Sequence, residues 1–214
     1  MKKTLIIIPA YNEDKTISDV LSSLNTAGFA NILVVDDGSC DSTKEVVLQT
    51  ASNIISYEKN IGYSKAIQEG LKWACDQQFD FAITYDADGE FFASDALKID
   101  ELLRKNMVKV AIGTRYYFPR ASEKIINFFT SHVLGIKDYF CGLKGFNLQI
   151  FKSEISRRDC SNNNSQLLSY AIKNKMLIAQ TPISLNTNSI RESRFGMSLV
   201  SEIKILNSFM RGFI

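Results

Sequence analysis

The stretch FAITYDADG at residues 81–89 decides the fold. An apolar run typical of a buried strand ends at Asp86 and Asp88, and a glycine then allows a turn. The stretch ILVVDDGS at residues 32–39 repeats this plan with Asp36 and Asp37. Open α/β sheets bind ligands at the carboxyl ends of their parallel strands. Because an Asp-x-Asp pair suits a divalent cation that also holds phosphate oxygens, we expect an enzyme that handles a nucleotide diphosphate through a metal.

Around these two stretches, apolar runs alternate with segments of helical periodicity, which predicts an α/β fold with parallel pairing and right-handed crossovers. Strands are expected at residues 5–8 (closed by Pro9), 32–35, 54–57, 81–85, 109–112 and 176–183. Helices are expected at residues 14–27, 41–50, 63–75, 95–104, 123–134 and 166–175. Residues 138–146 read as a glycine-punctuated loop that leads into a strand, residues 186–198 as a polar loop, and residues 199–214 as an amphipathic segment.

Composition indicates one globular domain over residues 1–214, with 45% hydrophobic and 22% charged residues. The net charge of +2 is divided unevenly. Residues 1–100 carry eight Lys or Arg and sixteen Asp or Glu, a net charge of −8, whereas residues 101–214 carry +10. An acidic half suits metal binding and a basic half suits phosphates or a lipid surface. Two solvated faces explain the asymmetry equally well.

The four cysteines, Cys40, Cys75, Cys141 and Cys160, lie far apart and show no C-x-x-C spacing. Neither a zinc site nor a disulfide framework is indicated, so we expect a reducing, cytoplasmic compartment. The amino terminus enters a short apolar strand and not a signal-peptide core. No apolar run approaches the ~18 residues that a membrane span needs, so any membrane contact is expected to be peripheral.

Two further segments fit a nucleotide site. PAYNE at residues 9–13 follows the first strand and can receive a base or ribose, although such turns often hold Asn and Glu as helix caps. NIG at residues 60–62 precedes a helix, where Gly62 permits close backbone approach and the helix amino terminus favours phosphate. Adjacent Asp36 and Asp37 repel each other unless a cation or hydroxyls occupy them, which favours a binding role.

Five motifs together resemble the family 2 glycosyltransferases, in their order and spacing: residues 9–13, VDDGS at 35–39, 60–62, DADG at 86–89 and GTR at 113–115. The resemblance is strongest to the branch that includes dolichyl-phosphate mannose synthase and polyprenyl-phosphate sugar transferases. Within residues 138–144, DYFCGLK resembles that branch's Asp-x-x-(Ser/Cys)-Gly-(Phe)-(Arg/Lys) segment. Residues 191–198 resemble its late Arg…Gly-x-Ser loop, with Arg194, Gly196 and Ser198 as the matching positions.

This resemblance implies a GT-A fold, with a Rossmann-like, mostly parallel central sheet flanked by helices. It also implies a UDP- or GDP-sugar donor, Mg²⁺ or Mn²⁺, and inversion at the anomeric carbon. Residues 1–115 would form the nucleotide-sugar and metal half, and residues 116–214 the acceptor half. The expected nucleotide-sugar residues are Pro9, Tyr11, Glu13, Asp36, Asp37, Gly62, Asp86, Asp88 and Arg194. Asp86 and Asp88 are the expected metal ligands, and Asp88, Arg115 and Asp138 the expected catalytic residues.

One departure concerns the acceptor. Gln166 stands where relatives often carry Asp or Glu, and Glu90 where many carry Gln, which leaves a general base in doubt. An ionised acceptor needs no base, so we expect a polyprenyl phosphate, although Asp138 or Asp159 would supply a base for a polysaccharide or glycolipid hydroxyl. Arg115 and Arg194 would lie near the donor phosphates or the acceptor.

Several alternatives remain at this point. A nucleotidyltransferase that makes nucleotide sugars, or a non-catalytic nucleotide-sugar-binding subunit, fits part of the pattern. Otherwise the expected role is cell-envelope glycan synthesis at the inner face of the membrane, and no nucleic acid is expected as a partner. The apolar stripe of residues 199–214 either docks on the domain or contacts lipid. His132 is expected at the surface or an interface, and Trp73 in the core.

Overall fold

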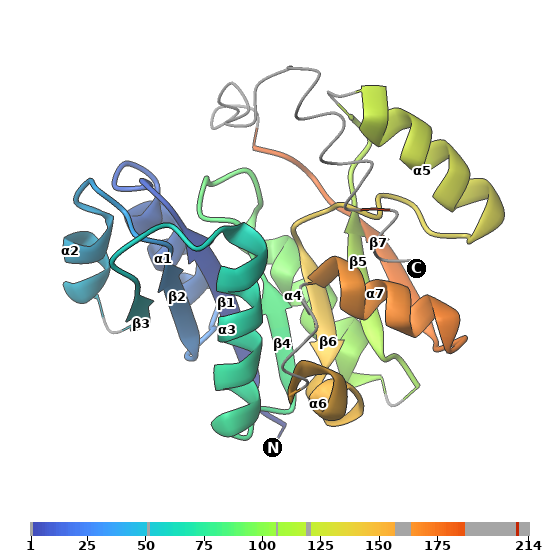
Figure 1. Ribbon diagram of the computed structural model, residues 1–214, viewed down its shortest axis with the longest axis horizontal. Coiled ribbons are helices and arrows are strands. Elements are labelled where there is room, and N and C mark those ends of the chain that lie inside the picture. Colours follow the sequence, from blue (N-terminus) through green and yellow to red (C-terminus); the bar gives the residue numbers. More distant parts are fainter. Residues whose placement is uncertain are drawn as a thin grey trace.

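The computed structural model describes residues 2–50, 52–105, 107–118, 121–156, 164–186 and 209. These residues form a seven-stranded sheet in the order β3-β2-β1-β4-β6-β5-β7, with helices on both faces (Figure 1). The strands are β1 (Thr4–Ala10), β2 (Ile32–Asp36), β3 (Asn53–Ser56), β4 (Phe81–Thr84), β5 (Val110–Thr114), β6 (Lys144–Asn147) and β7 (Ile178–Pro182). The helices are α1 (Ile17–Thr26), α2 (Thr43–Leu48), α3 (Tyr63–Asp76), α4 (Ala93–Arg104), α5 (Ala121–Val133), α6 (Leu148–Ser156) and α7 (Asn164–Lys173).

The sheet is mostly parallel, as predicted, but β6 runs antiparallel to both of its neighbours, β4 and β5. The other four neighbouring pairs are parallel. The reversal decides where the site lies, because the start of β6 meets the carboxyl ends of β4 and β5. Residues 138–143, which lead into β6, therefore reach the edge where Asp86 and Arg115 follow their strands.

The expected strands and helices form within a few residues of their predicted bounds, with two differences. Strand β1 continues through Pro9, whereas we expected it to end there. Its pairing with β4 stops at Ile7, so Pro9 has a partner strand on one side only and needs no ladder N–H on the other. Helix α6 was not predicted, because it begins directly after β6 without a turn residue between them.

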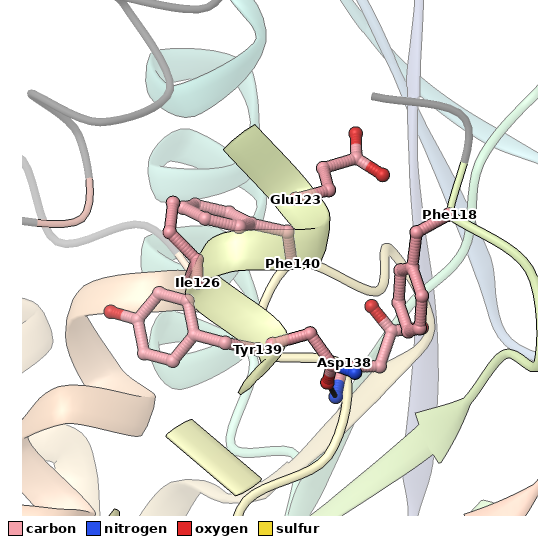
Figure 2. Close-up of a pocket in the computed structure, with 7 residues that line it drawn as sticks. Phe118, Glu123, Ile126, Asp138, Tyr139 and Phe140 are labelled. Atoms are coloured by element: carbon pink, nitrogen blue, oxygen red, sulfur yellow. Dashed lines mark hydrogen bonds between the residues drawn. The ribbon is translucent and has the colours of Figure 1, made fainter. Parts of the chain in front are cut away.

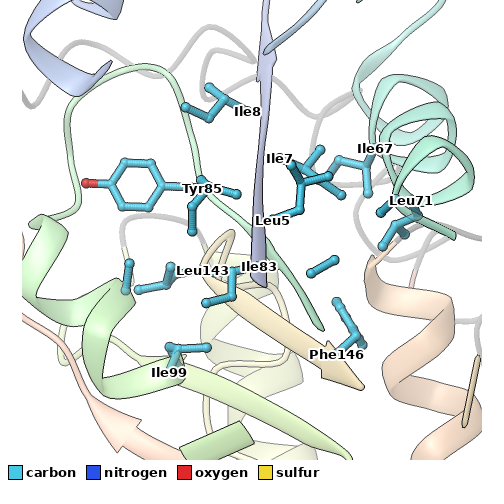
Figure 3. Close-up of a cluster of buried hydrophobic side chains, with 14 of the residues drawn as sticks. Leu5, Ile7, Ile8, Ile67, Leu71, Ile83, Tyr85, Ile99, Leu143 and Phe146 are labelled. Carbon is cyan, nitrogen blue, oxygen red and sulfur yellow. The ribbon is translucent and has the colours of Figure 1, made fainter. Parts of the chain in front are cut away.

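The core lies on both faces of the sheet around β1 and β4. Ile67 and Leu71 of α3 pack toward Ile7 of β1 on one side, and Ile99 of α4 packs toward Ile83 of β4 on the other (Figure 3). All five side chains are fully buried. At about 25 cal/mol per Å² of apolar surface removed from water, this burial holds the strand ends in place beneath the polar loops. Among the described helices, none has the length and apolar character that a bilayer crossing requires.

Candidate active site

Two carboxylates at the end of β2 are held by hydrogen bonds from other segments. Asp36 accepts the Ser56 hydroxyl at 2.9 Å and the Ser39 amide at 3.1 Å. Asp37 accepts the backbone amides of Ile61, at 2.6 Å, and Gly62, at 3.0 Å. These donors offset the repulsion between the adjacent acids without a cation. Asp37 thus holds the loop before α3 in place. Its contact with the nucleotide stays a prediction.

The loop after β1 is tied to the loop after β2. The Asn12 amide donates to Ser39 Oγ at 2.9 Å, and Asn12 Oδ1 accepts the Cys40 amide at 2.8 Å. Glu13 is buried, its amide donates to Thr43 Oγ1, and its carboxylate accepts the Thr16 hydroxyl at 2.9 Å. Tyr11, by contrast, is exposed at the same edge. The Glu13 backbone carbonyl accepts the amides of Thr16 and Ile17 at the start of α1.

Asp86 and Asp88 lie on the turn after β4, and both side chains are half-buried. Burial and the neighbouring charge of Asp88 raise the pKa of the Asp86 carboxyl to about 7. Burial and Asp88 also raise the pKa of Glu90. The charge of Asp88 thus opposes ionisation of both Asp86 and Glu90, and a nearby positive charge would favour their ionised forms. A bound divalent cation would supply that charge.

Two residues hold Asp86 in place. The Tyr63 hydroxyl, at the start of α3, donates to Asp86 Oδ1 at 2.8 Å. Gly142 lies against the same carboxylate, and a Cβ added there would overlap Asp86 Oδ2. Only glycine therefore allows the 138–143 loop to approach the turn this closely. The carboxylate thus has a fixed orientation at the sheet edge.

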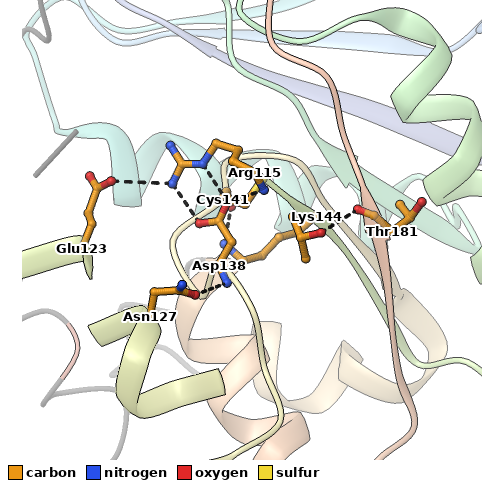
Figure 4. Close-up of polar contacts among 8 residues, drawn as sticks. Arg115, Glu123, Asn127, Asp138, Cys141, Lys144 and Thr181 are labelled. Carbon is orange, nitrogen blue, oxygen red and sulfur yellow. Dashed lines mark hydrogen bonds and ion pairs between the residues drawn. The ribbon is translucent and has the colours of Figure 1, made fainter. Parts of the chain in front are cut away.

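Arg115 follows β5 and is clamped by Asp138 (Figure 4). Its Nε donates to Asp138 Oδ2 at 2.7 Å and one terminal nitrogen to Oδ1 at 2.8 Å, while its backbone amide also donates to Oδ2 at 3.0 Å. Glu123 of α5 lies 3.8 Å from the guanidinium. Asp138 is 1% exposed, and these charge-assisted bonds raise the pKa of Arg115. The clamp gives Asp138 a positioning role, and the geometry offers no separate support for a role as base.

Lys144, at the start of β6, is completely buried below this edge. Its ammonium donates to the Cys141 carbonyl, and burial lowers its pKa to about 8. The carbonyls of Gly142 and Lys144 both accept the Thr84 hydroxyl of β4. These bonds lock the 138–143 loop to the strand that carries Asp86.

A shallow depression lies beside the clamp (Figure 2). It is lined by Phe118, Glu123, Ile126, Asn127, Asp138, Tyr139 and Phe140. Phe209 packs edge-on against Tyr139, with ring centroids 5.2 Å apart, and also contacts Phe140 and Phe129. Apolar rings thus surround the buried side of the Arg115–Asp138 pair.

The arrangement fits a divalent cation shared with a ligand. Among the described residues, no three His, Cys, Asp or Glu side chains gather into a ready metal site. Mg²⁺ and Mn²⁺ bound together with nucleotides commonly take only one or two carboxylates from the protein, and phosphates and waters supply the remainder. Asp86 and Asp88 lie together after β4, and the charge of Asp88 raises the pKa of Asp86, which a cation would offset. These two carboxylates could therefore supply the protein ligands of such a metal ion.

Comparison with known proteins agrees with this geometry. Residues 5–158 match the family model described as glycosyl transferase family 2. The chain belongs to this family. It is an enzyme of the glycosyltransferase class, and the nucleotidyltransferase alternative gains no support from the match.

Among its relatives is a UDP-N-acetylglucosamine–dolichyl-phosphate N-acetylglucosaminyltransferase of Methanococcus voltae, 32% identical over 85% of each chain. Another is a dolichyl-phosphate beta-glucosyltransferase of Trichomonas vaginalis, 28% identical over 86% of this chain and 64% of that protein. These relatives confirm the resemblance to the polyprenyl-phosphate branch. A solved structure of Mycobacterium tuberculosis glucosyl-3-phosphoglycerate synthase with Mn²⁺, UDP-glucose and phosphoglyceric acid superposes with a TM-score of 0.77, at 13% identity, over 99% of this chain and 80% of that one. The predicted GT-A fold is confirmed.

The structure brings most predicted site residues to one edge of the sheet. Pro9, Tyr11, Glu13, Asp36, Asp37, Gly62, Asp86, Asp88, Arg115 and Asp138 all lie at strand ends or in the loops beside them. Arg194, Asp159 and, apart from Phe209, residues 199–214 lie outside the described residues. Tyr63 was missed, because a tyrosine at a helix start carries no distinctive pattern. Gly142 and Lys144 belong to the motif at residues 138–144, and the motif alone does not indicate that they contact Asp86 and Thr84.

Proposed function

We propose that this glycosyltransferase moves a sugar, with inversion, from a UDP- or GDP-sugar to a polyprenyl phosphate. The observation that carries the proposal is the junction of Asp86 with the 138–143 loop. It sets a metal-type carboxylate pair beside an arginine that Asp138 holds rigidly. The names of the relatives, which act on dolichyl phosphate, support this acceptor class. The sugar transfer would take place at the inner face of the membrane, as a step of cell-envelope glycan synthesis.

The donor would lie over the ends of β1, β2 and β4. Asp36 and the exposed Tyr11 would contact the nucleoside, and Gly62 directly precedes the amino terminus of α3, which favours phosphate. Asp86 and Asp88 would hold Mg²⁺ or Mn²⁺, which neutralises charge on the departing nucleoside diphosphate. The solved relative contains Mn²⁺ together with UDP-glucose, which supports this metal class.

Arg115 would act on the developing charge of the phosphates. Its guanidinium is oriented by Asp138, so little reorganisation is needed as charge develops. One face of the guanidinium lies 5.7 Å from the Phe118 ring. A charged group next to aromatic side chains suits an amphiphilic acceptor whose phosphate lies at the arginine.

The absence of an acidic residue at position 166 fits the same acceptor. A sugar hydroxyl normally loses its proton to a base during attack, whereas a phosphate monoester, with a second pKa near 6, is already ionised. Asp138 is engaged on both carboxylate oxygens, which leaves it poorly placed as a base. A glycan hydroxyl acceptor remains the second candidate, with a base supplied from elsewhere.

Asp88→Asn tests the proposal. The variant should keep its melting temperature, because a half-buried strand-end carboxylate contributes little packing, yet lose Mn²⁺-dependent stabilisation by UDP- or GDP-sugars. Transfer to polyprenyl phosphate should fall with it. Asp19→Asn, an acid on α1, is the matched control and should behave as wild type. Full turnover in excess chelator, or transfer only to a hydroxyl acceptor, would refute the proposal.

A further inference from the structure

Arg115 faces two carboxylates, and they act on it in different ways. Asp138 accepts hydrogen bonds from Nε at 2.7 Å and from Nη2 at 2.8 Å. Glu123 Oε2 lies 3.8 Å from the same Nη2, a distance that is too long for a hydrogen bond. Asp138 therefore orients the guanidinium through two bonds, whereas Glu123 acts on it as a nearby charge.

The two carboxylates approach the guanidinium from different sides (Figure 4). An arginine side chain has five N–H groups in one plane, and the bonds to Asp138 use two of them. The N–H groups that remain are sufficient to hold a phosphate by two parallel bonds. Glu123 lies beside Nη2 on a side that Asp138 does not cover, so an arriving phosphate would meet its carboxylate there.

Helix α5 fixes Glu123 at this position. The residue lies in the first turn of the helix, is 8% exposed, and lines the shallow depression beside the clamp. Because little solvent screens a carboxylate at such a place, it interacts strongly with neighbouring charges. Its charge also reaches the turn after β4: burial and Asp88 raise the pKa of Glu90, and Glu123 adds to this rise.

The ion pairs of Arg115 with described residues set one positive charge against two negative charges. A phosphate that comes to Arg115 must therefore overcome repulsion from Glu123, and like charges placed together suppress the binding of wrong partners. We propose that Glu123 competes with phosphate for Arg115, so that only a phosphate with further binding energy, from a metal ion or an apolar chain, is held there. This inference rests on the proposed function, which places a substrate phosphate at Arg115.

This role of Glu123 is opposite to that of Asp138. Loss of the Asp138 charge should impair the enzyme, because Asp138 orients the guanidinium. Loss of the Glu123 charge should strengthen phosphate binding, because a competitor is removed. A carboxylate that only supported Arg115 would behave like Asp138, so the direction of the change separates a competitor from a support.

Thermal unfolding of the full chain with inorganic phosphate, at constant ionic strength, tests the competition. Glu123→Gln keeps the size of the side chain and removes its charge. It should reach a given phosphate-dependent rise in melting temperature at about a tenfold lower phosphate concentration than wild type, because a like charge is removed. The gain should vanish in an Arg115→Gln background, where no guanidinium binds the phosphate. Asp100→Asn breaks another acid–arginine pair, with Arg104, and should respond as wild type.

Transfer kinetics give a second readout of the same competition. In Glu123→Gln, the KM for polyprenyl phosphate should fall about tenfold, with a smaller change in kcat, because binding of the acceptor phosphate is strengthened. Inorganic phosphate should also inhibit this variant at a lower concentration than it inhibits wild type. Glu123→Met, which has a similar size and no charge, should reproduce these changes and replaces the glutamine variant if that variant does not fold.

A phosphate response of the Glu123 variants that equals or falls below that of wild type would overturn the inference. So would an equal gain in the Arg115→Gln background, since Glu123 would then not act at Arg115. Transfer only to a hydroxyl acceptor, lost in Glu123→Gln, would make Glu123 the base and overturn both proposals. If wild type transfers nothing to polyprenyl phosphate but the Arg115-dependent gain in phosphate binding persists, the proposed function fails and the competition stands.

Discussion

Gly142 lies against the carboxylate of Asp86, so closely that a Cβ at position 142 would overlap Oδ2. Gly142→Ala should therefore push the Asp86 carboxylate or the 138–143 loop out of place. We expect metal affinity or turnover to fall roughly 10–100-fold, as is usual when a group behind a metal ligand is lost. The measurement is the Mn²⁺ concentration for half-maximal transfer.

The control is Gly145→Ala in β6, whose Cβ would meet Ile99 and Leu103 at 2.6 Å and touch no site residue. This variant should lose stability but keep the wild-type dependence on Mn²⁺. A Gly142→Ala enzyme with lowered melting temperature and unchanged metal dependence would mean that the contact serves only packing.

The clamp between Asp138 and Arg115 predicts strong coupling. Asp138→Asn removes one charge of a buried pair, a change that costs about 3–5 kcal/mol when the partner stays uncompensated. We expect kcat to fall with little change in the donor KM. In a double-mutant cycle, Arg115→Gln should cost little more once Asp138→Asn is present. Additive losses would contradict a clamp, and loss of turnover confined to hydroxyl acceptors would make Asp138 the base.

The Tyr63–Asp86 hydrogen bond predicts a pH effect. The bond favours the ionised carboxylate and so opposes the burial that raises the pKa of Asp86 to about 7. Tyr63→Phe should raise that pKa further, so protons would compete more strongly with the metal. We expect the acid limb of the transfer rate to move to higher pH and the Mn²⁺ requirement at pH 7 to increase several-fold. Tyr117 is an exposed tyrosine without this contact, so Tyr117→Phe should leave the acid limb where it is in wild type. If both variants shift the acid limb equally, or if Tyr63→Phe does not shift it, the Tyr63–Asp86 bond does not set the pH dependence.

Local patterns were sufficient for the strand ends and for Asp86 and Asp88, because a strand followed by acids and glycine is encoded within nine residues. Local patterns were insufficient for contacts that depend on the direction in which a strand runs. Gly142 reaches Asp86 only because β6 is reversed, and no local pattern states that reversal. The clamp joins Arg115 to a residue 23 positions later, a pairing that residue types alone leave open.

Lys144 shows a different gap between sequence and structure. Lysine is among the residues least often buried, so a sequence argument places its side chain in solvent. Its burial follows from a position at the start of β6, between β4 and β5, where the sheet and the 138–143 loop enclose it. The Cys141 carbonyl replaces the water that the ammonium loses.

Burial of Lys144 makes protein stability depend on pH in a defined window. Below about pH 8 Lys144 is charged in both the folded and the unfolded chain, and burial of the charged ammonium lowers the stability of the folded state. Between about pH 8 and the ordinary lysine pKa of 10.5 the unfolded chain holds one more proton at this group, so the free energy of unfolding attributable to Lys144 rises with pH. The rise across the window is on the order of 3 kcal/mol.

Urea unfolding of wild type and Lys144→Met from pH 7 to pH 10 isolates this contribution, because burial raises the pKa of Cys141, the thiol coupled to Lys144, to about 12, above this window. We expect the difference, wild type minus variant, to increase toward high pH. Lys98→Met is the control, since Lys98 is a half-exposed lysine that pairs with Asp95, and should show no such slope. A pH-independent difference for Lys144→Met would mean that the buried ammonium keeps an ordinary pKa, with Asp138 and Asp86 fully offsetting its desolvation.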